Sequence, residues 1–147
     1  MARHSAINVV ADAVVAALNV TSIRALCPGG VYRNRPTAQT TPYLSIGPCS
    51  EQPDDRMGTH YAHIVTVPVR VVTSGADANG ESRAIGILDA AMALLDEPVA
   101  APTLTGWTIG MVRWVETRIE FTDLSLDGTG ELGYIGTATF EYLVAQA

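Results

Sequence analysis

Residues 60–73 constrain the fold more than any other part of the chain, because apolar and polar side chains alternate there with a period of two. Such alternation predicts a β-strand, and about 14 residues is far above the usual strand length of about 5–6. The strand is therefore expected to bend or to extend beyond the main sheet. Pro68 lacks a backbone N–H, so the strand should be an edge or a bulge at that point. One face is predicted to carry Tyr61, His63, Val65, Val67, Val69 and Val71.

The flanking segments predict a sheet with a helix on one face. A short strand is expected around Tyr43–Ile46, and residues 48–59, rich in Pro, Asp and Gly, are expected to form a projecting loop. After a second polar loop, a helix should end near Leu95. Its apolar stripe is predicted to contain Ile85, Leu88, Met92 and Leu95.

The two ends of the chain complete this plan. Ser5 is a candidate N-cap for an Ala-rich helix, and a short second helix is expected over residues 21–26. Residues 31–32, 107–121 and 133–144 read as strands. The whole chain, residues 1–147, is predicted to be one α+β domain. It should contain an antiparallel-rich mixed sheet with long strands, packed by two main helices on one face.

Simple alternation of side chains along residues 107–121 predicts two faces. Met111, Val115, Ile119 and Phe121 are expected on one face. A Trp among charged side chains is typical of an amphipathic contact surface, although Trp114 could equally belong to the core. The other face is the candidate subunit interface and contains Trp114, Glu116, Arg118 and Glu120.

The charge balance excludes one class of partner. The chain has 15 acidic residues and 9 basic ones, and its formal net charge is −6. A surface that grips nucleic acid needs clustered Lys and Arg to displace counterions, so specific nucleic-acid binding is not expected. A surface past which DNA slides without sticking is compatible with this composition.

The sequence offers no recognisable catalytic or metal-binding constellation. His60 and His63 lie three apart in a strand and would point to opposite faces, so they should not share an ion. Asp54 and Asp55 are read as a solvated pair, and no cofactor or enzyme motif is found. No segment predicts a membrane span. Cys27 and Cys49 are expected to be free thiols, although a single bridge is possible.

The order of these motifs resembles the small tail terminator or tail completion proteins of long-tailed, siphovirus-type bacteriophages. The resemblance covers most of the chain. It begins with an Ala-rich helix and a Gly-Val-Tyr turn at residues 30–32, followed by Pro-Tyr-x-x-Ile-Gly at 42–47. A long strand opened by His and a flanked helix come next. A final hairpin with Asp127-Gly128 ends in the aromatic strand Thr139-Phe140-Glu141-Tyr142.

The resemblance implies a structural virion protein with no catalysis and no cofactor. Such proteins form a ring, typically of six subunits, that caps the tail tube, ends its polymerisation and joins it to the head. The implied partners are other copies of the chain, the tail tube protein and a head–tail connector, with assembly in the host cytoplasm. Genomic DNA would cross an acidic channel. The candidate channel or tube-contact loop contains Glu51, Asp54, Asp55 and Arg56.

Three other functions stay open at this point. Another neck protein, such as a head-completion or connector subunit, has a sequence that is hard to distinguish from a terminator. A small-ligand regulatory module of the α+β type would need an apolar pocket with convergent polar groups. An enzyme is the least supported class, and would depend on His60, His63, Asp54 or Asp55.

Overall fold

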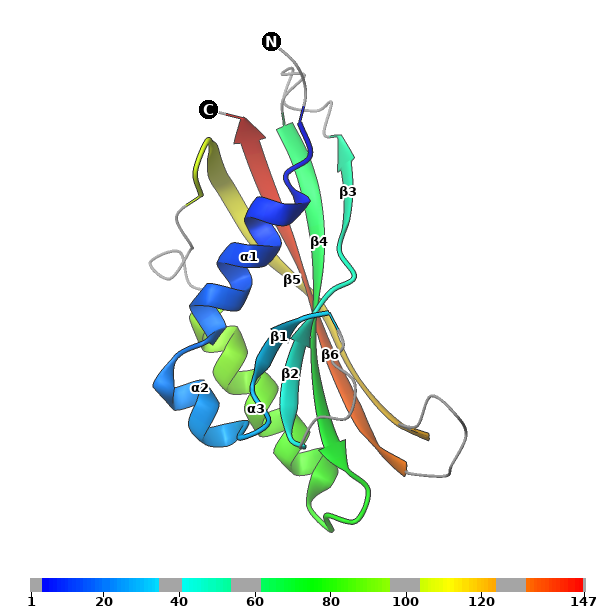
Figure 1. Ribbon diagram of the computed structural model, residues 1–147. Coiled ribbons are helices and arrows are strands. Elements are labelled where there is room, and N and C mark those ends of the chain that lie inside the picture. Colours follow the sequence, from blue (N-terminus) through cyan, green and yellow to red (C-terminus); the bar gives the residue numbers. More distant parts are fainter. Residues whose placement is uncertain (1–3, 35–40, 54–61, 96–103, 124–131, 147) are drawn as a thin grey trace.

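The computed structural model describes residues 4–34, 41–53, 62–95, 104–123 and 132–146 (Figure 1). In these ranges the chain forms helices and strands in alternating groups. Their order is α1 (Ile7–Leu18), α2 (Thr21–Leu26), β1 (Val31–Arg33), β2 (Tyr43–Ile46), β3 (Ser50–Pro53), β4 (Ala62–Ser74), α3 (Gly80–Leu95), β5 (Trp107–Asp123) and β6 (Leu132–Gln146).

The strands form one twisted sheet in the spatial order β1-β2-β4-β6-β5, and β3 pairs with β4 beyond the end of β2. Among the pairs formed by the described residues, only β1 and β2 run parallel, whereas the other pairs are antiparallel. Figure 1 shows the helices gathered on one face of this sheet. The predicted α+β class, the mixed but antiparallel-rich sheet and the long strands are confirmed.

Strand β4 explains how Pro68 is tolerated inside a sheet. On one side β4 pairs with β6 without interruption, including Pro68 opposite Thr139. On the other side its neighbour changes from β2, which ends at Ile46, to β3, which begins at Ser50. Between these two strands, the Pro68 carbonyl accepts a hydrogen bond from the Gly47 N–H. The position where Pro68 lacks an N–H therefore faces the gap between β2 and β3, where no strand needs a donor. The expected interruption therefore occurs on one side of the strand only.

The core lies between the helices and one face of β4 and β6. The predicted alternation of β4 is confirmed, since Val65, Val67, Val69 and Val71 are fully buried. Phe140 and Tyr142 of β6 are the largest side chains buried beside them. Helix α1 covers this layer with Val10, Ala11, Val14 and Leu18.

Two predicted details of this layer are wrong. Helix α3 buries the stripe Ala84, Ile87, Leu88, Ala91 and Leu95, whereas Ile85 is exposed. Compared with the predicted stripe, the buried face of α3 is shifted toward Ala84 and Ala91. These small side chains allow the helix to approach the sheet closely. Residues 50–53, expected within a loop, form β3 and pair with residues 63–66 of β4. The remainder of that predicted loop, residues 54–59, lies outside the described residues.

Two glycines should respond in opposite ways to an added methyl group. A Cβ at Gly75 would lie 2.4 Å from the backbone oxygen of Leu132, whereas a Cβ at Gly86 meets nothing within 4 Å. We expect Gly75→Ala to destabilise the protein by about 1–3 kcal/mol. Gly86→Ala should stabilise it by about 0.5–1 kcal/mol through helix propensity. Urea denaturation of both variants tests this, and equal effects of the two substitutions would contradict it.

Candidate assembly interface

Strand β5 forms one edge of the sheet along its whole length. It pairs with β6 on one side, and among the described residues no strand pairs with its other side. Most of its side chains are exposed, although it is the longest strand at 17 residues. A long unpaired edge exposes backbone N–H and C=O groups that can bind another chain. The opposite edge of the sheet is made of the short strands β1 and β3.

Two irregularities divide β5 into three parts. The register with β6 shifts between Ile109 and Met111 and again between Trp114 and Glu116. One extra residue, Gly110 or Val115, is accommodated at each shift, as in a β-bulge. Each extra residue exchanges the two faces for the part that follows, so simple alternation does not hold across 107–121.

The second bulge separates the predicted interface residues. Trp114 pairs with Phe140 and therefore lies on the face that carries the helices. Its indole Nε1 donates to Thr117 Oγ1 at 3.0 Å, a contact between residues three apart that the bulge allows. Glu116, Arg118 and Glu120 project from the helix-free face instead. The prediction that the four share a face is wrong.

The three charged residues form a short row along the helix-free face. Arg118 lies 3.3 Å from a carboxylate oxygen of Glu116 and 3.6 Å from one of Glu120. All three side chains are more than half exposed, so these pairs contribute little to folding. They remain available to a neighbouring molecule, and their assignment to a subunit interface stays a prediction.

Exposed apolar side chains gather at the same edge. Within the described residues seven large apolar side chains are exposed, and five of these belong to β5 or the start of β6. Met111, Trp114, Val115, Phe121 and Leu132 are each 45–54% exposed. Met111, Val115 and Phe121 were predicted to share one face, but Met111 lies on the helix-free side and Phe121 on the helix side. An edge with exposed apolar groups on both faces is typical of a contact surface.

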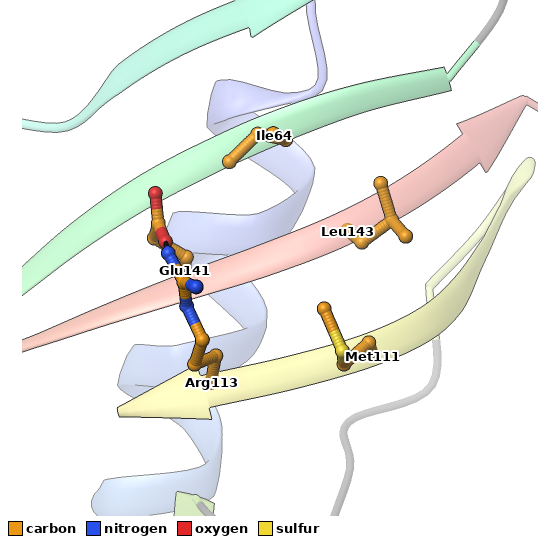
Figure 2. Close-up of a pocket in the computed structure, with 5 residues that line it drawn as sticks. All are labelled: Ile64, Met111, Arg113, Glu141 and Leu143. Carbon is orange, nitrogen blue, oxygen red and sulfur yellow. Dashed lines mark hydrogen bonds and ion pairs between the residues drawn. The ribbon is translucent and has the colours of Figure 1, made fainter. Parts of the chain in front are cut away.

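A shallow hollow lies on the helix-free face beside this edge (Figure 2). Ile64, Met111 and Leu143 supply apolar walls, and the ion pair between Arg113 and Glu141 borders them. Its volume is about 120 Å³. Ligand pockets usually measure roughly 300–1,000 Å³, so this hollow suits a side chain of a partner better than a free small molecule.

Glu51 connects elements that are distant in the sequence, which its local sequence does not indicate. One carboxylate oxygen accepts from the Ala6 N–H at 2.7 Å, at the start of α1, and lies 3.1 Å from His63 Nδ1. A carboxylate only accepts, so Nδ1 carries the hydrogen in this contact. The Trp107 ring meets the His63 ring edge-on at 5.2 Å. Glu51 therefore ties α1, β3 and β4 together, and its predicted place in a projecting loop is wrong.

Asp54, Asp55 and Arg56 of the predicted loop lie outside the described residues, and so does His60 at the predicted start of the long strand. The channel or tube contact expected of Asp54, Asp55 and Arg56 stays a prediction. His63 is buried, and its Nε2 has no hydrogen-bond partner among the described residues. Those residues contain no group of three or more His, Cys, Asp or Glu that could hold a metal ion.

Both cysteines are free thiols, as predicted. Burial raises the pKa of Cys27 to about 11, and it also raises the pKa of Cys49, which Arg33 opposes. Neither thiol is therefore activated as a nucleophile. Among the helices of the described ranges, none has the length and apolar character that a membrane crossing requires.

Two comparisons with known proteins give matches. Residues 11–125 match the family model described as tail completion protein gp17. Among solved structures, a chain from the "Virion of native gene transfer agent (GTA) particle" superimposes with a TM-score of 0.69 at 16% sequence identity. The match covers 97% of this chain and 100% of that chain. Curated proteins give no match.

Removing the Glu51 carboxylate should destabilise the isolated protein. Glu51→Ala leaves the buried His63 Nδ1 and the Ala6 N–H without their acceptor, and one such loss costs about 1–3 kcal/mol. Urea denaturation measures the change in unfolding free energy. Glu120→Ala, which removes an exposed carboxylate, is the control and should change it by less than about 1 kcal/mol. Equal unfolding free energies of the two variants would contradict the stabilising role of Glu51.

Proposed function

The chain belongs to the tail completion protein gp17 family, and from this premise we propose that it closes into a ring of six copies at the end of a tail tube. Membership of the family makes it a structural protein of a phage-type virion, located in the tail. The ring, its copy number and its contacts are the further steps proposed here. The exposed edge strand β5 and the acidity of the chain support them.

The unequal edges of the sheet are the observation that carries the proposal. One edge is the exposed strand β5 with its apolar side chains, and the other consists of the short strands β1 and β3. These edges are too different in length for continuous strand pairing between β5 and the opposite edge of another copy. A contact between β5 and a different surface of the next copy is heterologous, and such contacts form a ring when the rotation closes.

The ring would end polymerisation by covering the last layer of tube subunits. Its two faces would then contact the tail tube protein on one side and a head–tail connector on the other. A structural protein of this kind needs complementary surfaces and no catalytic group. The row Glu116, Arg118 and Glu120 and the half-exposed Trp114 are proposed as parts of the subunit contact.

The acidity of the chain supports a passive DNA channel. Each copy carries a formal charge of −6, so six copies carry about −36 (6 × −6). A bore with this sign repels phosphate and allows the genome to slide. Asp54, Asp55 and Arg56 remain the proposed channel or tube-contact residues, whereas the Glu51 carboxylate is engaged inside its own subunit.

Electron microscopy of tails assembled with and without the protein tests the proposed role. With it, tubes should end in a terminal ring of six subunits at a uniform length. Without it, tubes should lack this ring and grow past that length. Rings that contact a head connector but never the tube would instead favour a head-completion role, and a protein that stays monomeric beside finished tubes would contradict both.

Trp114→Ser should weaken assembly without unfolding the subunit. Truncating an aromatic anchor in an interface typically costs at least about 2 kcal/mol, or roughly 30-fold in affinity per contact. Sedimentation velocity over a concentration series measures the association. Trp114→Phe is the matched control and should retain most of the affinity, because it keeps an aromatic ring. Unchanged association of Trp114→Ser would remove this residue from the contact.

A further inference from the structure

A second hollow on the helix-free face of the sheet contains a positive charge without a counter-charge. It lies over β2, β4 and β6 and has a volume of about 180 Å³. Its apolar walls are Tyr43, Val72 and Ile135, and its polar groups belong to Ser45 and Arg70. Like the hollow in Figure 2, it is smaller than the roughly 300–1,000 Å³ of a ligand pocket, so it suits a single side chain. We call it the Arg70 hollow.

Arg70 differs from other arginines of the same face in its partners. Arg113 and Arg118 each pair with carboxylates of the helix-free face. Arg70 is half-buried, and its Nη1 donates to the Gly47 carbonyl, but among the described residues no carboxylate pairs with it. Other N–H donors of this guanidinium therefore have no protein acceptor within the described ranges. A partly buried charge in this state favours the arrival of an anionic group.

Ser45 adds a hydroxyl group beside this guanidinium. Ser45 and Arg70 lie opposite each other in the register of β2 and β4, so their side chains project from the same face. Ser45 is only 3% exposed, and its hydroxyl makes no hydrogen bond to a described residue. Buried polar side chains usually have a partner. The hydroxyl and the guanidinium together point to an acceptor that these ranges of the chain do not supply.

A carboxylate is the group that satisfies both side chains at once. Its two oxygens can accept parallel N–H bonds from a guanidinium and a further bond from a hydroxyl. The contact with Gly47 restricts the Arg70 side chain before binding, so less conformational freedom is lost when the acceptor arrives. The walls Tyr43 and Val72 are 5% and 6% exposed. Mostly buried walls keep water away from a charge pair and strengthen its attraction.

We propose that the Arg70 hollow binds the carboxylate of an Asp or Glu side chain that a protein partner inserts. An apolar residue beside that Asp or Glu would lie against Ile135. The charges of the face select an acidic occupant, since Arg113 and Arg118 already have carboxylate partners and Arg70 has none among the described residues. Family membership places the chain in a virion tail, so the partner would be a protein of that particle. The inference does not depend on ring closure.

NMR titration of the isotope-labelled protein tests the hollow with a defined probe. N-acetyl-glutamate N-methylamide should cause saturable shifts of the Ser45 and Arg70 amide signals. N-acetyl-glutamine N-methylamide has nearly the same shape without the charge and should bind at least about tenfold more weakly. Equal binding of the two probes, or no saturable shift with either, would overturn the inference. Tighter binding of inorganic phosphate than of the glutamate probe would identify a site for free anions and contradict a protein partner.

Two substitutions and a matched control assign the binding to the hollow. Arg70→Gln removes the charge while its amide can still donate to the Gly47 carbonyl, and it should weaken binding of the glutamate probe at least about tenfold. Ser45→Ala leaves Arg70 in place and should weaken binding about three- to tenfold. Arg118 aligns with Arg70 across Thr137 of β6, and Arg118→Gln should change the affinity less than about twofold. Equal effects of Arg70→Gln and Arg118→Gln would contradict the assignment.

Competition during tail assembly tests whether the occupant is a protein. When wild-type and Arg70→Gln chains are offered in equal amounts to assembling tails, mass spectrometry should find the variant incorporated at least about threefold less often. The NMR spectrum of the free variant checks that it is folded. Equal incorporation of a folded variant that no longer binds the glutamate probe would overturn a protein partner.

Microscopy of the same tails separates this inference from the proposed function. Terminal rings built from a chain that binds no carboxylate in the Arg70 hollow would overturn this inference and leave the ring intact. Probe binding and selective incorporation without any ring would support the hollow and contradict ring closure. The absence of both probe binding and rings would overturn both proposals.

Discussion

The central interaction of this structure is the antiparallel ladder that joins β4, β6 and β5. Strand β6 is paired on both sides over nearly its whole length, so it can hold two long strands in register. Helices α1 and α3 bury one face of this ladder and supply the core. Among the described strands, β5 lies at the end of the sheet and has a strand partner on one side only. The fold therefore leaves an exposed edge surface as a direct result of how it is built.

Local features of β5 determine what this surface can bind. Its two bulges turn successive parts of one strand toward different faces, so apolar groups appear on both sides of the edge. Bulges also interrupt the regular hydrogen-bonding pattern and increase twist, which reduces uncontrolled strand addition. The surface that results can contact a partner through side chains as well as through the backbone. This combination suits an assembly protein whose contacts must form in one orientation.

The sequence predicted the elements that follow simple periodicity and failed where a tertiary contact decides the structure. The structure confirms the alternation of β4 and the helical spacing of Val10, Val14 and Leu18 in α1. Both predictions hold because each pattern corresponds to a single buried face of its element. Strand β3 was missed because Ser-Glu-Gln-Pro lacks β-branched or aromatic residues and exists through pairing with β4. In the same way, Glu51 gave no local sign that it accepts hydrogen from Ala6 and lies against His63.

The candidate interface was predicted only in part for the same reason. Residue types indicated a contact surface on residues 107–121, but alternation could not locate the bulges at Gly110 and Val115. Gly110 was the available signal for the first bulge, since Gly inside a strand often marks one. No comparable signal marks Val115.

Hydrogen exchange of the β5 amides, in the monomer and in the assembled particle, tests most directly whether a second copy covers this edge. In the monomer, amides of β5 that do not donate to β6 should exchange quickly, whereas β6 amides should be protected. On assembly the β5 amides should slow by at least an order of magnitude, and those of β6 should change little. Equal exchange of β5 in monomer and assembly, whether fast or slow, would contradict the account.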